Sequence, residues 1–186
     1  ILVNKPSGVI VTSDRSRPDN IIDLIDYEER IFPVGRLDVK SEGLLILTND
    51  GILSNRLMHP RYEHEKEYVV RVDRPIEKID IGRLQSGVML DDGITLPAKV
   101  RSLSTHKFAI ILREGRNRQI RRMCEELGYQ VVTLQRTRVG TLKIPMSYPV
   151  GNWRHLTISE VRQLKKLVGL EPGPPQKQYK KKRRKS

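Results

Sequence analysis

The chain has 186 residues, which suits one larger domain or two small halves and is long enough to bury a core. A net charge of +13 and a pI near 10.1 indicate a polyanionic partner, and charge alone leaves RNA, DNA and a membrane surface open. The chain lacks the run of about 18 apolar residues that a membrane-spanning helix needs, and it shows no signal peptide, so we expect a cytoplasmic protein. A single cysteine, Cys124, excludes an internal disulfide, and the four scattered histidines show no metal-ligand spacing.

The N-terminal third contains two predicted strands. Residues Ile1–Val3 begin inside an apolar run that turns at Pro6–Gly8, so we expect a further segment before this one in the full-length protein. A short helix is predicted over Leu24–Arg30. The continuous apolar run Leu44–Leu47, bounded by turn residues, predicts a buried strand.

The middle of the chain alternates helices and strands. Asp50 is typical of an N-cap for a helix that ends at His59, and Pro75 can start a helix that passes through Ile79 and ends at Gly87. The remaining strand-like segments are Glu65–Val72, Val88–Leu90, Leu96–Leu103, Phe108–Leu112 and Val131–Val139.

The segment Arg113–Gly128 reads as a basic loop, an N-cap at Asn117 and a helix whose Ile120 and Met123 face inward. The sequence Thr157-Ile-Ser-Glu predicts a capping box for the last helix. Strands outnumber helices and do not follow strict βαβ alternation. We therefore predict an α+β fold with a mixed, largely antiparallel central sheet flanked by helices.

The C-terminal end differs in composition from the rest. Seven of the 35 basic residues lie between Lys177 and Ser186, where there is no acidic residue, and the preceding Glu171-Pro-Gly-Pro-Pro is typical of a linker. We expect a folded domain over residues 1–170 and a disordered basic tail over 171–186. The tail either binds RNA weakly or improves solubility, and the sequence leaves both alternatives open.

One carboxylate lies in an unusual place. Asp38 is in a polar loop just before the predicted strand at Leu44, and a loop fixed to a buried strand can present a side chain accurately. The simpler alternative is that Asp38 caps a turn or pairs with Arg36. A carboxylate that acts as nucleophile or base must stay charged. Arginine is the side chain best suited to keep it ionised, so Arg121 is a candidate partner. Tyr68, on the apolar face of its strand, could equally be a core residue.

Several separate segments resemble the RsuA-like family of ribosomal RNA pseudouridine synthases over about residues 1–170. Within that family, His64-Glu-Lys-Glu-Tyr and Arg118-Gln-Ile-Arg-Arg-Met-Cys-Glu are closest to the RluF branch, which modifies large-subunit ribosomal RNA. The segments that carry the resemblance are Gly35-Arg-Leu-Asp, Ser41-Glu-Gly-Leu-Leu-Ile-Leu-Thr-Asn-Asp-Gly, Lys66-Glu-Tyr, Gly115-Arg-Asn-Arg-Gln-Ile-Arg-Arg-Met and Gly151-Asn-Trp-Arg.

The resemblance implies an active site without a metal or cofactor. Asp38 matches the essential aspartate, which either attacks the anomeric carbon of the ribose or removes the neighbouring proton. Arg121 matches the arginine paired with that carboxylate, and Tyr68 the tyrosine that stacks on the target base. Among the RNA-binding positions, Arg36 would fill the gap left by the flipped base and Leu134 would form an apolar wall opposite Tyr68. The other RNA-backbone or site-supporting positions are Lys66, Arg118 and Lys5.

The implied activity is isomerisation of a uridine in ribosomal RNA, most simply large-subunit RNA, by a monomer. Members of the family usually carry a small RNA-binding domain before the catalytic part, and we expect this chain to start after it. Two alternatives remain: the same chemistry on small-subunit or transfer RNA, and a non-catalytic assembly factor that binds ribosomal RNA through the same basic cleft.

Overall fold

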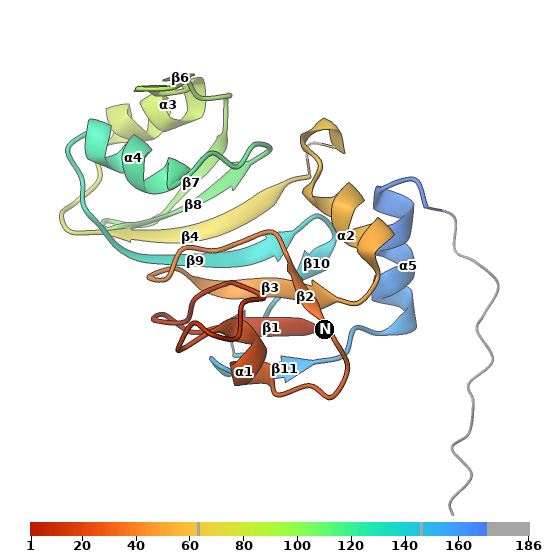
Figure 1. Cartoon of the computed structure of the whole chain (residues 1–186). Coiled ribbons are helices and arrows are strands. Elements are labelled where there is room, and N and C mark those ends of the chain that lie inside the picture. The colour runs from red at the N-terminus through yellow and green to blue at the C-terminus, as the bar shows by residue number, and fades with distance from the viewer. Residues whose placement is uncertain (63, 146, 171–186) are drawn as a thin grey trace, which may run out of the picture.

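A computed structural model describes residues 1–170 except Glu63 and Met146, and the predicted linker and tail lie outside the described residues. Helices surround a nine-stranded sheet (Figure 1). The strands are β1 (Leu2–Lys5), β2 (Phe32–Val34), β3 (Glu42–Thr48), β4 (Lys66–Val72), β7 (Lys99–Ser104), β8 (Lys107–Leu112), β9 (Val131–Val139), β10 (Leu142–Lys143) and β11 (Trp153–Arg154), with β5 (Met89–Leu90) and β6 (Gly93–Ile94) as a separate hairpin. The helices are α1 (Ile21–Ile25), α2 (Gly51–Met58), α3 (Lys78–Ser86), α4 (Gln119–Glu126), α5 (Ile158–Leu167) and the 3-10 turn η1 (Pro60–Tyr62).

The strand order is β11-β1-β3-β9-β4-β8-β7, with β2 paired to β3 and β10 paired to β9. Strands β3 and β9 run parallel, and the other pairs described are antiparallel. This topology confirms the α+β prediction of a mixed, largely antiparallel sheet. None of the described helices is long and apolar enough to cross a membrane.

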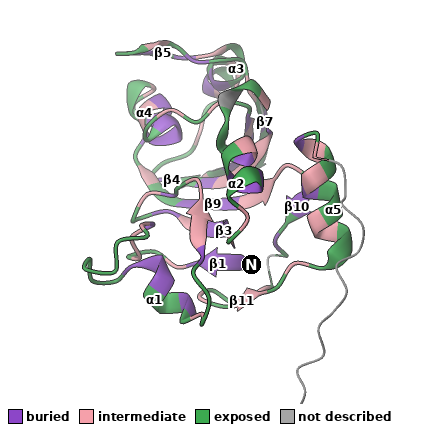
Figure 2. Cartoon of the chain, turned by 45° about the vertical axis from the view of Figure 1, so that its right-hand side comes forward, coloured by how far each residue is buried: buried purple, intermediate pink, exposed green. Residues whose placement is uncertain are grey.

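Strand β3 is the core of the N-terminal half because both of its faces are covered. Leu44 and Ile46 pack with α2 and α5, whereas Leu45 and Leu47 pack with α1 on the other side. Buried residues are concentrated in the central strands (Figure 2). Asp50 caps α2 by accepting the backbone N–H of Leu53 at 2.9 Å, as its position in the sequence predicts.

The second half has one core, on the face of β4 and β8 that is covered by α3 and α4. Val70 and Phe108 from the strands meet Leu84 of α3 and Met123 of α4, and all four are buried. Ile120 is buried as well, so the inward face predicted for α4 is confirmed.

Three predicted helix starts are wrong: a different side chain caps the first helix, and the other two begin without a side-chain cap. The first helix is Ile21–Ile25 rather than Leu24–Arg30, since the Asn20 side chain accepts the N–H groups of Ile22 and Asp23. Helix α3 starts at Lys78, three residues after Pro75, and its Ile79 is 63% exposed instead of facing the core.

Helix α4 starts after Arg118 and not after Asn117. Arg118 adopts a left-handed conformation with φ of 47° and makes no side-chain cap, so the local sequence carries no ordinary capping signal. The helix ends at Glu126 with Leu127 as its C-cap, and Gly128 follows with φ of 79°, which fits the predicted C-terminal glycine. The strand predicted over Leu96–Leu103 is displaced, since β6 ends at Ile94 and β7 starts at Lys99.

The two halves of the sheet meet where β3 pairs with β9. The described register consists of two pairs, Glu42 with Gln135 and Gly43 with Arg136. Gly43 has φ of 103°, and a Cβ at this position would overlap the carbonyl oxygen of Arg136. A glycine is therefore required twice over, by its conformation and by the close approach of the two backbones.

Gly43→Ala is expected to lower the free energy of unfolding by about 3 kcal/mol or more, because strain and overlap add. Chemical denaturation measures this change. Gly8→Ala is the matched control, since Gly8 also has positive φ, at 92°, but its Cβ would meet nothing within 4 Å. Equal losses in the two variants would contradict the close-approach argument.

Helix α5 begins with the predicted capping box at Thr157 and Glu160, which is confirmed. Glu160 also receives two hydrogen bonds from the guanidinium of Arg154, at 2.7 and 2.8 Å. The hydrogen bonds from Arg154, followed by those from Thr157, lower the pKa of Glu160 from 4.5 to about 2.

A carboxyl whose pKa is lowered by folding stabilises the protein above its unfolded pKa and loses that contribution as pH falls toward the folded pKa. The stability of the wild type should therefore decline between about pH 4.5 and pH 2 partly through this group. In Glu160→Gln, unfolding free energies measured by urea titration at several pH values should be lower at pH 6 and should fall less steeply below pH 4.5. Parallel curves for the two proteins would contradict this role of Glu160.

Candidate active site

A cavity of about 280 Å³ opens where the two halves of the sheet meet. It is lined by the loop before β3, the end of α2, strands β4 and β9 and the segment that leads into α4. Six of the eight sequence-predicted site residues line it, from four separate segments of the chain. They are Arg36, Asp38, Lys66, Tyr68, Arg118 and Leu134.

The loop that carries Asp38 is held from two sides by buried cations. The ammonium of Lys5 donates hydrogen bonds to the carbonyl oxygens of Val39 at 3.2 Å and Ser41 at 2.8 Å. The guanidinium of Arg121 donates to the carbonyl oxygen of Lys40 at 3.3 Å, and to that of Val131 in β9 at 3.2 Å. Three consecutive carbonyls after Asp38 are thus fixed to two different elements.

Asp38 and Arg121 form an ion pair, with 3.9 Å between Asp38 Oδ2 and Arg121 Nε. The Arg121 side chain is 7% exposed and that of Asp38 is 32% exposed. Arg121 Nε has no hydrogen-bond partner among the described residues, so this N–H remains available to the carboxylate. The pKa of Arg121 is lowered, mainly by burial and secondarily by the nearby positive charge of Arg118. The negative charge of Asp38 acts in the opposite direction and raises this pKa. The described ion pairs of Asp38 do not include Arg36, the alternative partner considered above.

Lys5 does not line the cavity and its side chain is completely buried. Besides the two loop carbonyls, its ammonium donates to the carbonyl oxygen of Pro6 at 2.8 Å. Burial lowers its pKa to about 8. Of the two roles that the resemblance leaves for Lys5, this geometry favours support of the loop over contact with an RNA phosphate.

Tyr68 and Leu134 lie side by side on the cavity face of the sheet. Tyr68 on β4 is opposite Arg136 on β9, and Leu134 is opposite Val70, so Tyr68 and Leu134 are diagonal neighbours. The two residues therefore adjoin each other on this face, and the role of Leu134 as an apolar wall opposite Tyr68 stays a prediction. Ile120 of α4 also lines the cavity.

Arg136 is a cavity residue that sequence reasoning missed. It is 4% exposed, and its Nε donates to the carbonyl oxygen of Leu44 in β3 at 2.8 Å. Its signal in the sequence is a charged residue at an inward position of β9, two residues after the apolar Leu134. Together with burial, the charge of Arg136 lowers the pKa of the neighbouring Lys66.

Two further cations lie on more open parts of the cavity. Arg36 is exposed and follows Gly35, whose φ is 73°. The Arg118 side chain is 46% exposed, and the residue holds the left-handed conformation that starts α4. With Lys66, these side chains give the cavity a positive rim that suits a phosphate backbone.

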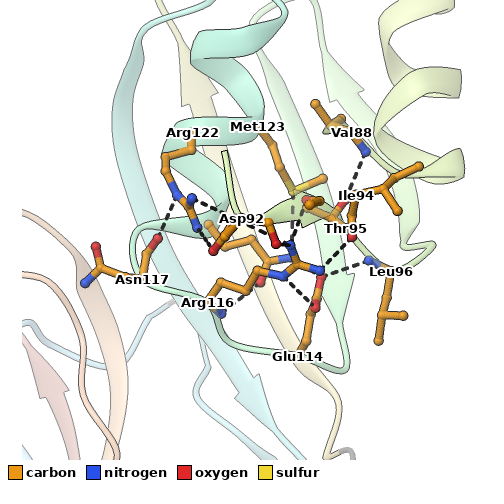
Figure 3. A network of polar contacts seen from close by, with 12 residues as sticks. Val88, Asp92, Ile94, Thr95, Leu96, Glu114, Arg116, Asn117, Arg122 and Met123 are labelled. Carbon is orange, nitrogen blue, oxygen red and sulfur yellow. Dashed lines mark hydrogen bonds and ion pairs between the residues drawn. The ribbon is translucent and has the colours of Figure 1, made fainter. Parts of the chain in front are cut away.

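A polar network fixes the segment between β8 and α4 (Figure 3). Arg116 donates to the carbonyl oxygens of Gly93 at 2.8 Å and Ile94 at 2.6 Å, and to the carboxylate of Glu114 at 3.0 Å. Gln119 donates to the same carboxylate at 2.6 Å. The β5–β6 hairpin therefore supports the cavity-lining loop, a connection between distant segments that the sequence does not reveal.

The described residues contain no group of three His, Cys, Asp or Glu side chains that could hold a metal ion. Cys124 lies behind the site in α4, where burial raises its pKa to about 12, so it remains a thiol at neutral pH. The reactive group that this arrangement presents to the cavity is the Asp38 carboxylate. It lies beside a buried cation and an apolar surface that fits a planar ring, a combination suited to nucleophilic or proton-transfer chemistry on a base-bearing sugar.

Comparison with known proteins identifies the family of the chain. The dual-specificity RNA pseudouridine synthase RluF of Escherichia coli strain K12 is 43% identical over 168 residues, which are 90% of this chain and 58% of RluF. The chain therefore spans little more than half the length of that relative. The ribosomal large subunit pseudouridine synthase B of Bacillus subtilis strain 168 is 38% identical over 175 residues, 90% of this chain and 71% of the relative.

The crystal structure of a pseudouridylate synthase matches the fold with a TM-score of 0.81 at 34% identity, over 88% of this chain and 72% of that one. The family model described as RNA pseudouridylate synthase matches residues 1–126. This range contains the Asp38 loop, Tyr68 and Arg121. The predicted family is confirmed: the chain belongs to the RNA pseudouridylate synthases.

Proposed function

We propose that the protein converts a specific uridine of large-subunit ribosomal RNA to pseudouridine. The observation that carries the proposal is the Asp38 carboxylate, held in a cavity between the buried Arg121 guanidinium and the surface that contains Tyr68. The name of the Bacillus subtilis relative, a large-subunit synthase, supports the choice of RNA. The substrate implies action in the cytoplasm, and one chain suffices because all the proposed site residues belong to it.

The reaction is an isomerisation, so atoms balance within the substrate. The bond between ribose C1′ and uracil N1 breaks, the uracil turns, C5 bonds to C1′, and the C5 proton is exchanged for one on N1. Asp38 starts the reaction as nucleophile at C1′ or as base at the neighbouring carbon, and both routes need it ionised. The Arg121 guanidinium keeps it so after the substrate has displaced water from the cavity.

The detached uracil must stay in place while it turns. Tyr68 and Leu134 offer adjoining flat and apolar contacts for this purpose. A base in a helix leaves its stack at a cost of a few kcal/mol. The exposed Arg36 occupies the vacated position in the RNA, while Lys66 and Arg118 contact phosphates at the rim.

Two alternative functions are a synthase that acts on another RNA and a non-catalytic RNA-binding factor. The relative RluF is named a dual-specificity enzyme, which favours a second RNA substrate, such as small-subunit or transfer RNA. A non-catalytic RNA-binding factor would use the positive rim but would have no need for the Asp38 carboxylate, because a negative charge opposes phosphate binding.

Asp38→Asn is expected to reduce turnover by roughly 10⁴-fold, because an amide is neither a nucleophile nor a base. RNA affinity should be unchanged or slightly higher, since a negative charge is removed. Tritium release from RNA labelled at uridine C5 measures turnover, and filter binding measures affinity. Pseudouridine mapping in cells that lack the protein, complemented with wild type or Asp38→Asn, identifies the uridine.

A site restored by both proteins would contradict the catalytic role of Asp38. Mapping that shows no change in ribosomal RNA but a change in transfer RNA would favour the first alternative, in which the substrate is transfer RNA. A variant that binds and functions like the wild type would favour the non-catalytic factor.

Lys5→Met tests support of the loop against RNA contact. Loss of the ammonium removes its hydrogen bonds to the carbonyls of Pro6 and Ser41 and leaves the Val39 carbonyl with only the backbone N–H of Gly8. The loop should loosen, so kcat should fall by about 10-fold or more while RNA affinity and its salt dependence stay constant. Arg118→Gln is the comparison, since loss of this exposed rim charge should weaken RNA binding and leave kcat unchanged. A Lys5→Met protein with weaker binding and normal kcat would instead indicate a phosphate contact.

A further inference from the structure

Three basic residues that the proposed reaction does not use lie together on the sheet face that points away from the cavity. Arg71 is on β4, Arg101 on β7 and Lys107 on β8, and all three are exposed. We call them the rear basic patch. No acidic side chain of the described residues forms an ion pair with any of the three, so none of these charges is neutralised by a direct contact.

Strand alternation places the patch on this face. Val70 and Val72 of β4 and Phe108 of β8 point into the core under α3 and α4, on the face that also carries Tyr68. Successive strand residues point to opposite faces, so Arg71 and Lys107 point away from that core.

The register brings the charges together. Arg71 is the direct cross-strand partner of Lys107. Arg101 is opposite Ala109, two residues along β8 from Lys107, and is therefore its diagonal neighbour on the same face. Like charges directly opposite each other in a sheet destabilise it. The pairing of Arg71 with Lys107 thus opposes folding, which calls for an explanation other than stability.

A hollow of about 510 Å³ adjoins the patch, lined in part by Arg71, His106 and Lys107. Asp73 lies on its border, and one oxygen of that carboxylate already accepts the backbone N–H of Gln130 at 2.9 Å. The lining contains no Phe, Tyr or Trp ring on which a base could stack. The hollow therefore suits phosphate groups rather than unpaired bases.

We propose that the rear basic patch binds phosphates of a second segment of the RNA substrate, on the opposite side of the sheet from the segment whose uridine enters the cavity. This inference rests on the proposed function for the identity of the polyanion. A large folded RNA can reach both faces of a small domain, whereas a short stem-loop bound in the cavity reaches one. The patch would then contribute affinity for the folded RNA without contributing to the chemical step.

The test compares two RNAs and two charge-matched variants. One RNA is a short stem-loop that carries the target uridine, and the other is a domain-sized transcript of the same ribosomal RNA. Arg71→Gln/Lys107→Gln removes two charges from the patch. Arg162→Gln/Lys166→Gln removes two charges from exposed positions of α5 and is the control.

For the patch variant, we expect affinity for the transcript to fall about 10-fold, with the slope of log K against log salt smaller by roughly 1.5. Stem-loop affinity and kcat should match the wild type, as should transcript binding by the control variant. A third variant, Arg71→Lys, should bind like the wild type because the charge is kept. The unfolding temperature of the patch variant should be equal or higher, since a like-charge pair is removed.

Unchanged affinity and slope for the transcript would overturn the proposal. It would also be overturned by an equal loss in the α5 control, which would indicate net charge alone, or by an equal loss on the stem-loop, which would assign the contact to the cavity segment. If the wild type binds the transcript through the patch but releases no tritium, the proposed function fails and the second binding surface stands.

Discussion

The site depends on two buried cations that hold the backbone after Asp38. Lys5 from β1 and Arg121 from α4 donate to three consecutive carbonyls of one short loop. Removing an ammonium and a guanidinium from water is costly, and hydrogen bonds to carbonyls offset that cost only when the geometry is good. The loop consequently has little freedom, and the carboxylate it carries is positioned before any substrate arrives. For the proposed reaction this is preorganisation, because no binding energy would be spent on ordering the carboxylate.

Neither half of the sheet contains the site alone. The N-terminal half supplies Asp38 and Lys5, whereas the second half supplies Tyr68, Leu134 and Arg121. The Arg116 network extends this dependence to the β5–β6 hairpin, which never enters the cavity but fixes the loop beside it. Burial thus separates two groups of charges. Those that support the structure are enclosed and paired with carbonyls or carboxylates, whereas those proposed to contact RNA, such as Arg36, are exposed to water.

The elements that were predicted correctly are those whose sequence signals lie within the element or directly beside it. The apolar run of β3, the Asp50 cap of α2 and the Thr157 capping box are each visible in neighbouring residues of the sequence, and all three were predicted at their observed positions. The start of α4 could not be predicted, because Arg118 takes a left-handed conformation with no capping side chain and Gln119 is held by Glu114. The family resemblance supplied the cavity residues, but pattern alone left Asp38 and Arg121 as one possible pair among several. Arg136 escaped notice because its partner, the Leu44 carbonyl, lies 92 positions away in the chain.

The parallel seam between β3 and β9 has a consequence for how such a protein can change over evolutionary time. It consists of two residue pairs, and one of them brings Gly43 so close to Arg136 that no side chain fits between them. A substitution at the seam would move Asp38 relative to Tyr68 and Arg121, whereas a substitution at an exposed loop position need not. The loops and surface of each half can therefore vary, while the residues that pair β3 with β9 should stay the same. New RNA specificities in this architecture should therefore arise by changes in the peripheral loops, with the pairing of β3 and β9 unchanged.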